Sequence, residues 1–374
     1  MMSLEKFGFD AGFRERFRPY QNKGYVPARI VAQHKGRYVV HTEKGMLSGK
    51  LSGKFIYQSD VRKDYPVVGD WVAVKIIEES ESVIYAVLPR KSSFSRKMAI
   101  SGGRKIRNGV IVGGNIEEQV LSANIDTAFI VTGLDDNFSI GRIERYITLV
   151  KSSGVHPVIL LNKCDLVEDA SCYKEKVRSV AEGIEIHSIS ASAGIHMNVL
   201  DPYTGPGQTI VFFGSSGVGK STIVNYLFHE DVQKTGATSE ANGKGRHTTT
   251  GSQLLFHESG CAVIDTPGMR ELQLWADEEV LMESFHDIHV LAEGCRYRDC
   301  RHEEEDQCRV REAIAEGKLD AERFQHFKSQ QKELVALKSS RESYYKDRSS
   351  HKKKKSVRRN GVDRSFYFSR EKEE

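Results

Sequence analysis

Short runs of β-branched and aromatic residues recur between residues 25 and 88. Glycine or polar turns separate these runs, as in His34-Lys35-Gly36 and Glu78-Glu79-Ser80. Runs of this length and spacing predict about five short strands that form a small all-β barrel. An OB-fold is the favoured interpretation, although an SH3-like barrel has the same periodicity. The clearest expected strands are Val26–Ala32, Gly36–Thr42, Gly69–Ile77 and Val83–Leu88.

The pattern changes from residue 116 to residue 275, where continuous apolar runs alternate with helical periodicity. Such runs are typical of buried parallel strands, and their alternation with helices predicts an α/β domain with a doubly wound parallel sheet. Ligands on such a sheet bind at the carboxyl ends of its strands. The expected strands are Thr127–Thr132, Val158–Leu161, Ile184–Ile189, Thr209–Phe213 and Ala262–Ile264, with a helix at Ile143–Val150.

The remaining segments have other compositions. At roughly 150 residues per domain, a chain of 374 residues predicts two or three domains. No apolar run approaches the ~20 residues of a membrane span, and the N-terminus lacks the apolar core of a signal peptide. We therefore expect no membrane association and no export. The expected division is a loosely ordered arm (1–24), the barrel with a basic linker (25–115), the sheet domain (116–275), a helical domain (276–337) and a basic, flexible tail (338–374).

Positive charge is concentrated in two segments, although the net charge of the whole chain is only +4. Seven basic and no acidic residues lie between residues 90 and 107, and thirteen basic against six acidic residues lie in the tail. A solvated connector and a soluble tail would explain both segments. The alternative is contact with a nucleic-acid phosphate backbone.

A phosphate-binding loop follows the expected strand Thr209–Phe213. The sequence there is G-x-x-x-x-G-K-S, and an apolar-periodic helix follows it. Glycines allow backbone N–H groups to surround phosphate oxygens, the lysine reaches the β- and γ-phosphates, and the serine hydroxyl is a ligand for Mg²⁺. The residues are Gly214, Ser215, Ser216, Gly217, Val218, Gly219, Lys220, Ser221 and Thr222.

Two further loops indicate which base is bound. Asn162-Lys163-Cys164-Asp165 follows one expected strand, and Ser190-Ala191-Ser192 follows the next. N-K-x-D is the base-reading loop of guanine-nucleotide proteins, because its carboxylate accepts hydrogen bonds from guanine N1–H and the 2-amino group. Adenine has no such pair of donors. Together with the phosphate loop, these motifs predict guanine specificity, with Asn162 and Asp165 selecting the base.

Two more segments match nucleotide-sensing switches. Asp265-Thr-Pro-Gly268 follows a strand, so that Asp265 would hold Mg²⁺ through water and the Gly268 N–H would sense the γ-phosphate. One threonine of residues 248–250, with Thr249 preferred, would complete the Mg²⁺ shell. The residue after Gly268 is apolar and cannot orient a water molecule by hydrogen bonding. We therefore expect His247 to place the attacking water instead. A solvent-facing loop histidine is the alternative for His247.

The order of the motifs is unusual. Common GTPases have the phosphate loop first and N-K-x-D late, whereas here N-K-x-D comes first. The same sheet can form when the old termini are joined and a new break opens elsewhere. The sequence therefore predicts a circularly permuted GTPase domain.

A cysteine cluster lies in the expected helical domain. Cys295, Cys300, His302 and Cys308 offer three thiolates and one imidazole within fourteen residues. This donor set predicts one closed, structural Zn²⁺ site, and four protein ligands leave no open position for catalysis.

These motifs together resemble the ribosome small subunit-dependent GTPase A family over about residues 25–337. The resemblance implies an N-terminal OB-fold, a permuted GTPase domain and a C-terminal zinc-binding domain. It also implies a cytoplasmic, largely monomeric protein that binds 16S rRNA and hydrolyses GTP to GDP when stimulated by the 30S subunit, late in 30S maturation. Two alternatives remain: a permuted GTPase of the large subunit, and a nucleotide-gated rRNA binder whose hydrolysis is incidental.

Overall fold

The computed structural model describes most of the chain. The described residues are 3–34, 36–59, 61–99, 105–107, 110–112, 116–229, 252–265 and 278–336. None of the helices within these ranges is long and apolar enough to cross a membrane. The expectations for the tail lie outside the described residues.

The N-terminal barrel has five strands: β1 (Val26–His34), β2 (Arg37–Thr42), β3 (Gly45–Leu51), β4 (Trp71–Glu78) and β5 (Glu81–Val87). Their order around the barrel is β1-β2-β3-β5-β4, and β4 pairs back onto β1. Strands β3 and β5 run parallel, and helix α2 (Gly53–Gln58) and the short turn η2 (Arg62–Asp64) lie between β3 and β4. This order distinguishes the OB-fold from an SH3-like barrel and confirms the favoured interpretation.

The N-terminal arm is an ordered part of the barrel, so the expectation of a loose segment was wrong. A short turn η1 (Leu4–Phe7) precedes helix α1 (Ala11–Gln21), and the Asp10 carboxylate caps that helix by accepting from the Phe13 N–H at 2.8 Å. Phe13 and Phe17 are four residues apart and therefore share one helix face, which packs in a cluster with the fully buried Trp71. Aromatic side chains thus fix a segment whose overall composition is polar.

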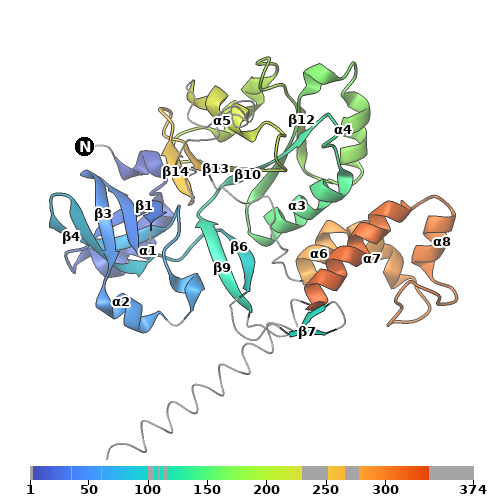
Figure 1. Ribbon diagram of the computed structural model, residues 1–374, viewed down its shortest axis with the longest axis horizontal. Helices are drawn as coiled ribbons and strands as arrows, with labels where there is room; N and C mark the ends of the chain where they lie inside the picture. The colour runs from blue at the N-terminus through green and yellow to red at the C-terminus, as the bar shows by residue number, and fades with distance from the viewer. Residues whose placement is uncertain are drawn as a thin grey trace, which may run out of the picture.

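The expected basic linker is instead a β-ribbon. Strand β6 (Ser93–Ala99) pairs antiparallel with β9 (Ile116–Ala123), and β7 (Lys105–Arg107) pairs with β8 (Val110–Val112) (Figure 1). The ribbon therefore crosses the boundary expected at residues 115–116. Apolar contacts anchor its base: Phe94 packs against Phe213 with ring centroids 4.5 Å apart, and Val120 and Ala123 of β9 are buried with Val67.

Two basic residues at the start of this segment are engaged internally. Arg90 forms a two-point ion pair with the fully buried Asp70, with nitrogen–oxygen distances of 2.7 and 2.8 Å. Lys91 pairs with Asp126 at 2.5 Å. These two ion pairs link the barrel, the ribbon and the sheet. The prediction of phosphate contact therefore applies to the basic residues after residue 91.

The central domain is the expected parallel sheet. The strand order is β12 (Glu185–Ser188), β11 (His156–Asn162), β10 (Thr127–Gly133), β13 (Thr209–Phe213), β15 (Ala262–Asp265) and β14 (Gln253–Phe256). Only β14 in this group is antiparallel to its neighbour, and it is not among the strands expected from the sequence. The connecting elements are α3 (Ile140–Ser152), η3 (Cys164–Leu166), α4 (Ser171–Arg178), η4 (Met197–Tyr203) and α5 (Lys220–Phe228).

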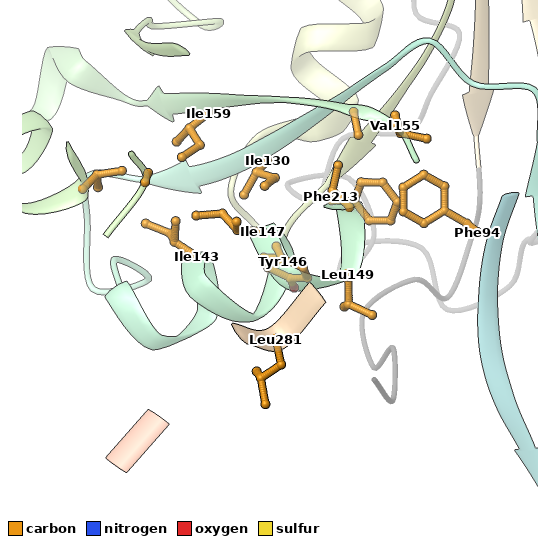
Figure 2. Packing of buried hydrophobic residues seen from close by; sticks show 14 of the residues in the cluster. Phe94, Ile130, Ile143, Tyr146, Ile147, Leu149, Val155, Ile159, Phe213 and Leu281 are labelled. Carbon is orange, nitrogen blue, oxygen red and sulfur yellow. The ribbon is translucent and has the colours of Figure 1, made fainter. Parts of the chain in front are cut away.

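Helix α3 has apolar contacts on two sides. Figure 2 shows Ile143 and Ile147 lying toward Ile130 and Ile159 of the sheet, while Leu281 of the C-terminal domain lies beyond the helix. All five side chains are at most 2% exposed. The sheet and the C-terminal domain therefore share one continuous core across α3.

The C-terminal domain is helical, as expected. It contains α6 (Glu278–Ser284), α7 (His286–Glu293), α8 (Arg309–Ala315) and a helix over residues 321–336. It packs beside α3, on the opposite side of the sheet domain from the barrel (Figure 1).

Candidate functional site

The phosphate loop occupies the turn between β13 and α5. Gly219 precedes the helix with φ of +98°, and Ser221 and Thr222 lie half-buried in its first turn. The Lys220 ammonium lies back across the loop and donates to the carbonyl oxygens of Gly214 at 2.8 Å and Ser215 at 2.6 Å. The helix N-terminus and this ammonium place positive potential at the mouth of the loop, where anionic phosphates are favoured.

Asn162 joins three loops. Its side-chain nitrogen donates to the Val218 carbonyl at 2.7 Å, and its side-chain oxygen accepts from the Ala191 N–H at 3.0 Å. A Cβ on Gly219 would lie 2.1 Å from that nitrogen, and only glycine allows so close an approach. The structure thus assigns Asn162, only 2% exposed, the role of a brace between the phosphate loop and both base loops, which sequence reasoning missed.

The base loop begins at Lys163, whose backbone is left-handed with φ of +66°. The turn η3 follows, tied to the neighbouring loop by the Cys164 N–H, which donates to the Ile189 carbonyl at 3.1 Å. Asp165 is exposed and stands on this turn, so its carboxylate is accessible to a ligand. Loop geometry therefore separates a buried brace, Asn162, from an exposed carboxylate, Asp165.

The Ser190 loop is a tight, closed turn. Ser190 and Ile195 exchange backbone hydrogen bonds at 3.0 Å, and the Ser190 hydroxyl accepts from the Ala193 N–H at 3.2 Å. Ser190 and Ala191 are buried, whereas residues 192–195 are exposed. Bonds from Cys164 to Ile189 and from Ala191 to Asn162 place this loop beside the base loop, and its contact with the base stays a prediction.

Asp265 ends strand β15, which is the parallel neighbour of β13. Burial raises the pKa of its carboxyl group, and the nearby Lys220 ammonium partly offsets that effect. A half-buried carboxylate beside the phosphate loop suits an indirect Mg²⁺ contact. The other sensing residues, His247, Thr249 and Gly268, lie outside the described residues.

One acidic residue of this region was not anticipated. Asp135 follows strand β10, and its carboxylate pairs with the Lys163 ammonium at 2.6 Å. The available signal was its position just beyond a buried strand, beside the strand that carries the base loop.

The four ligand candidates of the C-terminal domain converge. Their ligand atoms all lie within 4.8 Å of one another. The Sγ atoms of Cys295 and Cys308 are 3.9 Å apart, and His302 Nδ1 lies 3.6 and 3.3 Å from them. A tetrahedral site with Zn–S bonds of ~2.3 Å requires sulfur atoms about 3.8 Å apart, so the cluster fits a Zn²⁺ ion and could hold a metal.

The local electrostatics also favour metal binding. Burial lowers the pKa of His302, which favours the neutral imidazole that ligates metals. The Glu305 carboxylate organises the turn by accepting from the backbone N–H groups of Arg301 and Glu303, each at 2.8 Å. These bonds hold the pKa of Glu305 at about 2.

Comparisons with known proteins agree with this architecture. Residues 87–275 match the family model described as RsgA GTPase. The chain is 39% identical over 342 residues to the small ribosomal subunit biogenesis GTPase RsgA of Opitutus terrae, which covers 89% of this chain and 90% of that protein.

Solved structures extend the likeness to the whole fold. The crystal structure of YjeQ from Thermotoga maritima is 26% identical and has a TM-score of 0.57, over 83% of this chain and 99% of that chain. YloQ, described as a circularly permuted GTPase, is 23% identical with a TM-score of 0.55, over 83% of this chain and 96% of that chain, which shows the shared fold. With its motifs in permuted order between an OB barrel and a Cys₃His cluster, this chain belongs to the RsgA GTPase family.

Proposed function

We propose that this protein hydrolyses GTP to GDP and phosphate and acts in the biogenesis of the small ribosomal subunit. The observation that carries the proposal is the Asn162 brace, which brings the phosphate loop and the two base loops to one edge of the sheet. Membership in the RsgA GTPase family, and the printed function of the Opitutus relative, support the ribosomal role.

Guanine selection is assigned to Asp165. Its exposed carboxylate accepts from N1–H and the 2-amino group of guanine, and hydrogen bonds to a charged group are each worth about 1.5–3 kcal/mol. The backbone of Lys163 and Cys164 and the Ser190-Ala191 turn complete the base pocket.

Phosphate binding is assigned to residues 214–222, with Lys220 as the cation. Bound Mg²⁺ would neutralise developing charge on the phosphates, and Ser221, Thr249 and Asp265 are its proposed partners. The Gly268 N–H senses the γ-phosphate, and His247 orients the attacking water. His247→Ala should leave GTP binding intact and lower turnover at least tenfold, and unchanged turnover would remove His247 from the mechanism.

The metal proposed for Cys295, Cys300, His302 and Cys308 is one structural Zn²⁺ ion, which would cross-link the loop before α8. The proposed ribosomal contacts are the 16S rRNA surfaces reached by the barrel, the basic ribbon and the C-terminal domain, and the protein acts as a monomer in the cytoplasm. Elemental analysis of the purified protein should give one zinc per chain, and a metal-free folded protein would contradict the assignment.

The ribosomal role is tested by co-sedimentation with isolated subunits. In the presence of a non-hydrolysable GTP analogue, the protein should sediment with 30S and not with 50S subunits, and GDP should weaken the association. Binding to 50S alone would favour a role on the large subunit.

A further inference from the structure

We propose that Asp135 is a positioning residue of the base pocket, whose carboxylate holds the Lys163 side chain across the face of the bound guanine. The inference rests on the proposed function, because it assigns a second role to the same base loop. Neither the sequence motifs nor the family likeness marks Asp135.

The two loops leave the sheet side by side. Gly133 of β10 lies opposite Asn162 of β11, and the Leu134 N–H donates to the Asn162 carbonyl at 2.9 Å. This pairing continues the sheet by one bond beyond the strands. Asp135 and Lys163 follow directly after this last backbone bond. They are therefore the first residues beyond the two strands whose side chains can turn toward a ligand.

The Asp135 carboxylate is held in one orientation. Its Oδ1 atom accepts from the Asn137 N–H at 3.0 Å, which closes a turn typical of aspartate. A Cβ on Gly133 would lie 2.7 Å from the same oxygen, so glycine at that position lets the carboxylate fold back over the strand end. The second oxygen, Oδ2, is then directed at Lys163.

The Lys163 side chain is constrained at both of its ends, by the ion pair at the ammonium and by the backbone conformation at Cα. The Lys163 ammonium lies 2.6 Å from Asp135 Oδ2, and the two side chains are only 26% and 23% exposed. The left-handed backbone of Lys163 sets the direction in which its side chain leaves the chain, and the Asp135 carboxylate sets the position of its ammonium group. The four-carbon stem between these points offers an apolar strip on the loop that also carries Asp165, and such a strip suits contact with the face of a planar base.

The electrostatics agree with a persistent pair. Burial acts to raise the pKa of Asp135, but the hydrogen bonds from Lys163 and Asn137 outweigh it and lower that pKa. Asp135 is therefore charged at neutral pH. A freely rotating lysine would lose side-chain entropy on binding nucleotide, whereas a lysine already held in place loses less.

A salt bridge with no role in binding is the competing explanation. Ion pairs near a protein surface often contribute little to stability. Such a pair would change the melting temperature slightly and would leave nucleotide affinity unaltered. The two explanations therefore differ in the property that the substitution changes.

The test compares Asp135→Asn with Asp136→Asn, a neighbouring exposed carboxylate that serves as the matched control. The probe is fluorescent GDP, titrated into the full-length protein. We expect Asp135→Asn to weaken GDP binding about tenfold, to raise KM for GTP rather than lower kcat, and to melt within about 4 °C of the control.

A double variant shows whether Asp135 acts through Lys163. In a Lys163→Met background, Asp135→Asn should weaken GDP binding by less than twofold further. Equal affinity of Asp135→Asn and Asp136→Asn would overturn the inference, and so would a full additional loss in the Lys163→Met background. If the unmodified protein failed to bind GDP, the proposed function itself would fail, which is a separate result.

Discussion

The two junctions of the central domain are built differently. The barrel joins the sheet through backbone pairing, since β14 pairs with β1 at Gln253 and Ala32 and makes one eleven-stranded sheet. The C-terminal domain joins through side chains on helix α3. The first junction extends one sheet from the central domain into the barrel, whereas the second combines the shared apolar core with ion pairs that single substitutions can remove.

A buried guanidinium completes the barrel junction. Arg29 of β1 is 1% exposed and donates to the Phe7 and Asn124 carbonyls and, at 2.7 Å, to the Thr209 hydroxyl at the start of β13. Burial lowers the pKa of Arg29 to about 10, so the side chain remains charged at neutral pH. One side chain thus ties together the N-terminal arm, the ribbon and the central sheet.

Ion pairs dominate the polar contacts of the C-terminal junction. Glu144 of α3, only 2% exposed, pairs with Arg323 and lies 2.6 Å from His326 Nδ1. Arg145 forms a two-point pair with Glu333 at 2.8 and 2.9 Å. The two junctions therefore differ in kind: backbone pairing and a buried guanidinium join the barrel to the sheet, whereas a shared apolar core and ion pairs on α3 join the C-terminal domain.

Metal removal should have the largest effect and should be confined to the C-terminal domain. Structural zinc contributes apparent binding energies of about 10–16 kcal/mol in small modules. We expect a chelator to abolish the protection of residues 278–336 in hydrogen exchange while GDP binding changes less than threefold. If GDP binding were lost together with the zinc, the nucleotide site of the central domain would depend on the folded C-terminal domain, which would contradict this prediction.

Substitution of Arg29 should be the most damaging single change outside the metal site. Arg29→Met leaves several buried acceptors without a donor, and each buried acceptor left unsatisfied costs about 1–3 kcal/mol. Urea unfolding should show this loss in the transition shared by the barrel and the sheet. Arg18→Met, at an exposed position on α1, is the control and should change stability by less than 0.5 kcal/mol, which is ordinary for a surface site.

Glu144→Gln tests the buried part of the C-terminal junction. The neutral amide leaves Arg323 with its two-point pair to Asp287, at 2.7 Å for each bond, so the expected loss is smaller, about 1–3 kcal/mol. Limited proteolysis should release the C-terminal domain faster from this variant. An unchanged rate would show that the shared apolar core of Figure 2, rather than the charges, holds the domain.

The smallest effect is expected for the partly exposed ion pair between α3 and the C-terminal domain. Arg145→Met removes the pair with Glu333, whose side chains are each 31% exposed, and should cost about 0.5–1 kcal/mol at low salt. Because salt screens partly exposed charges, the difference from the unmodified protein should vanish near 1 M salt. A difference that persisted at high salt would show that packing, not charge, is lost.

Local patterns predicted the parallel strands and their terminal motifs because buried strands are continuous apolar runs. They failed where a few contacts between distant residues decide the structure. Helix α1 is polar overall and is held by Phe13 and Phe17 against Trp71, and the base of the ribbon is held by Phe94 and by Val120. Strand β14 is only four residues long and is defined by its neighbours β15 and β1.

The site was predicted as a set of residues but not as an arrangement. The motifs predict Asn162 as a base-selecting residue, which stays a prediction, and the structure adds that its buried amide braces Val218 and Ala191. Asp135 belongs to no motif and was found only by its distance from Lys163. Motifs name residues that contact a ligand directly, whereas residues that act through another side chain become visible only in three dimensions.

The most direct test of the central proposal is the GTP turnover of the full-length protein, measured with and without purified 30S subunits. We expect a low basal rate and at least a tenfold increase with 30S subunits, with no increase from 50S subunits. Lys220→Ala, which removes the phosphate-loop cation, should abolish both rates and exclude a contaminating hydrolase. A turnover rate that 30S subunits leave unchanged would contradict the proposed function.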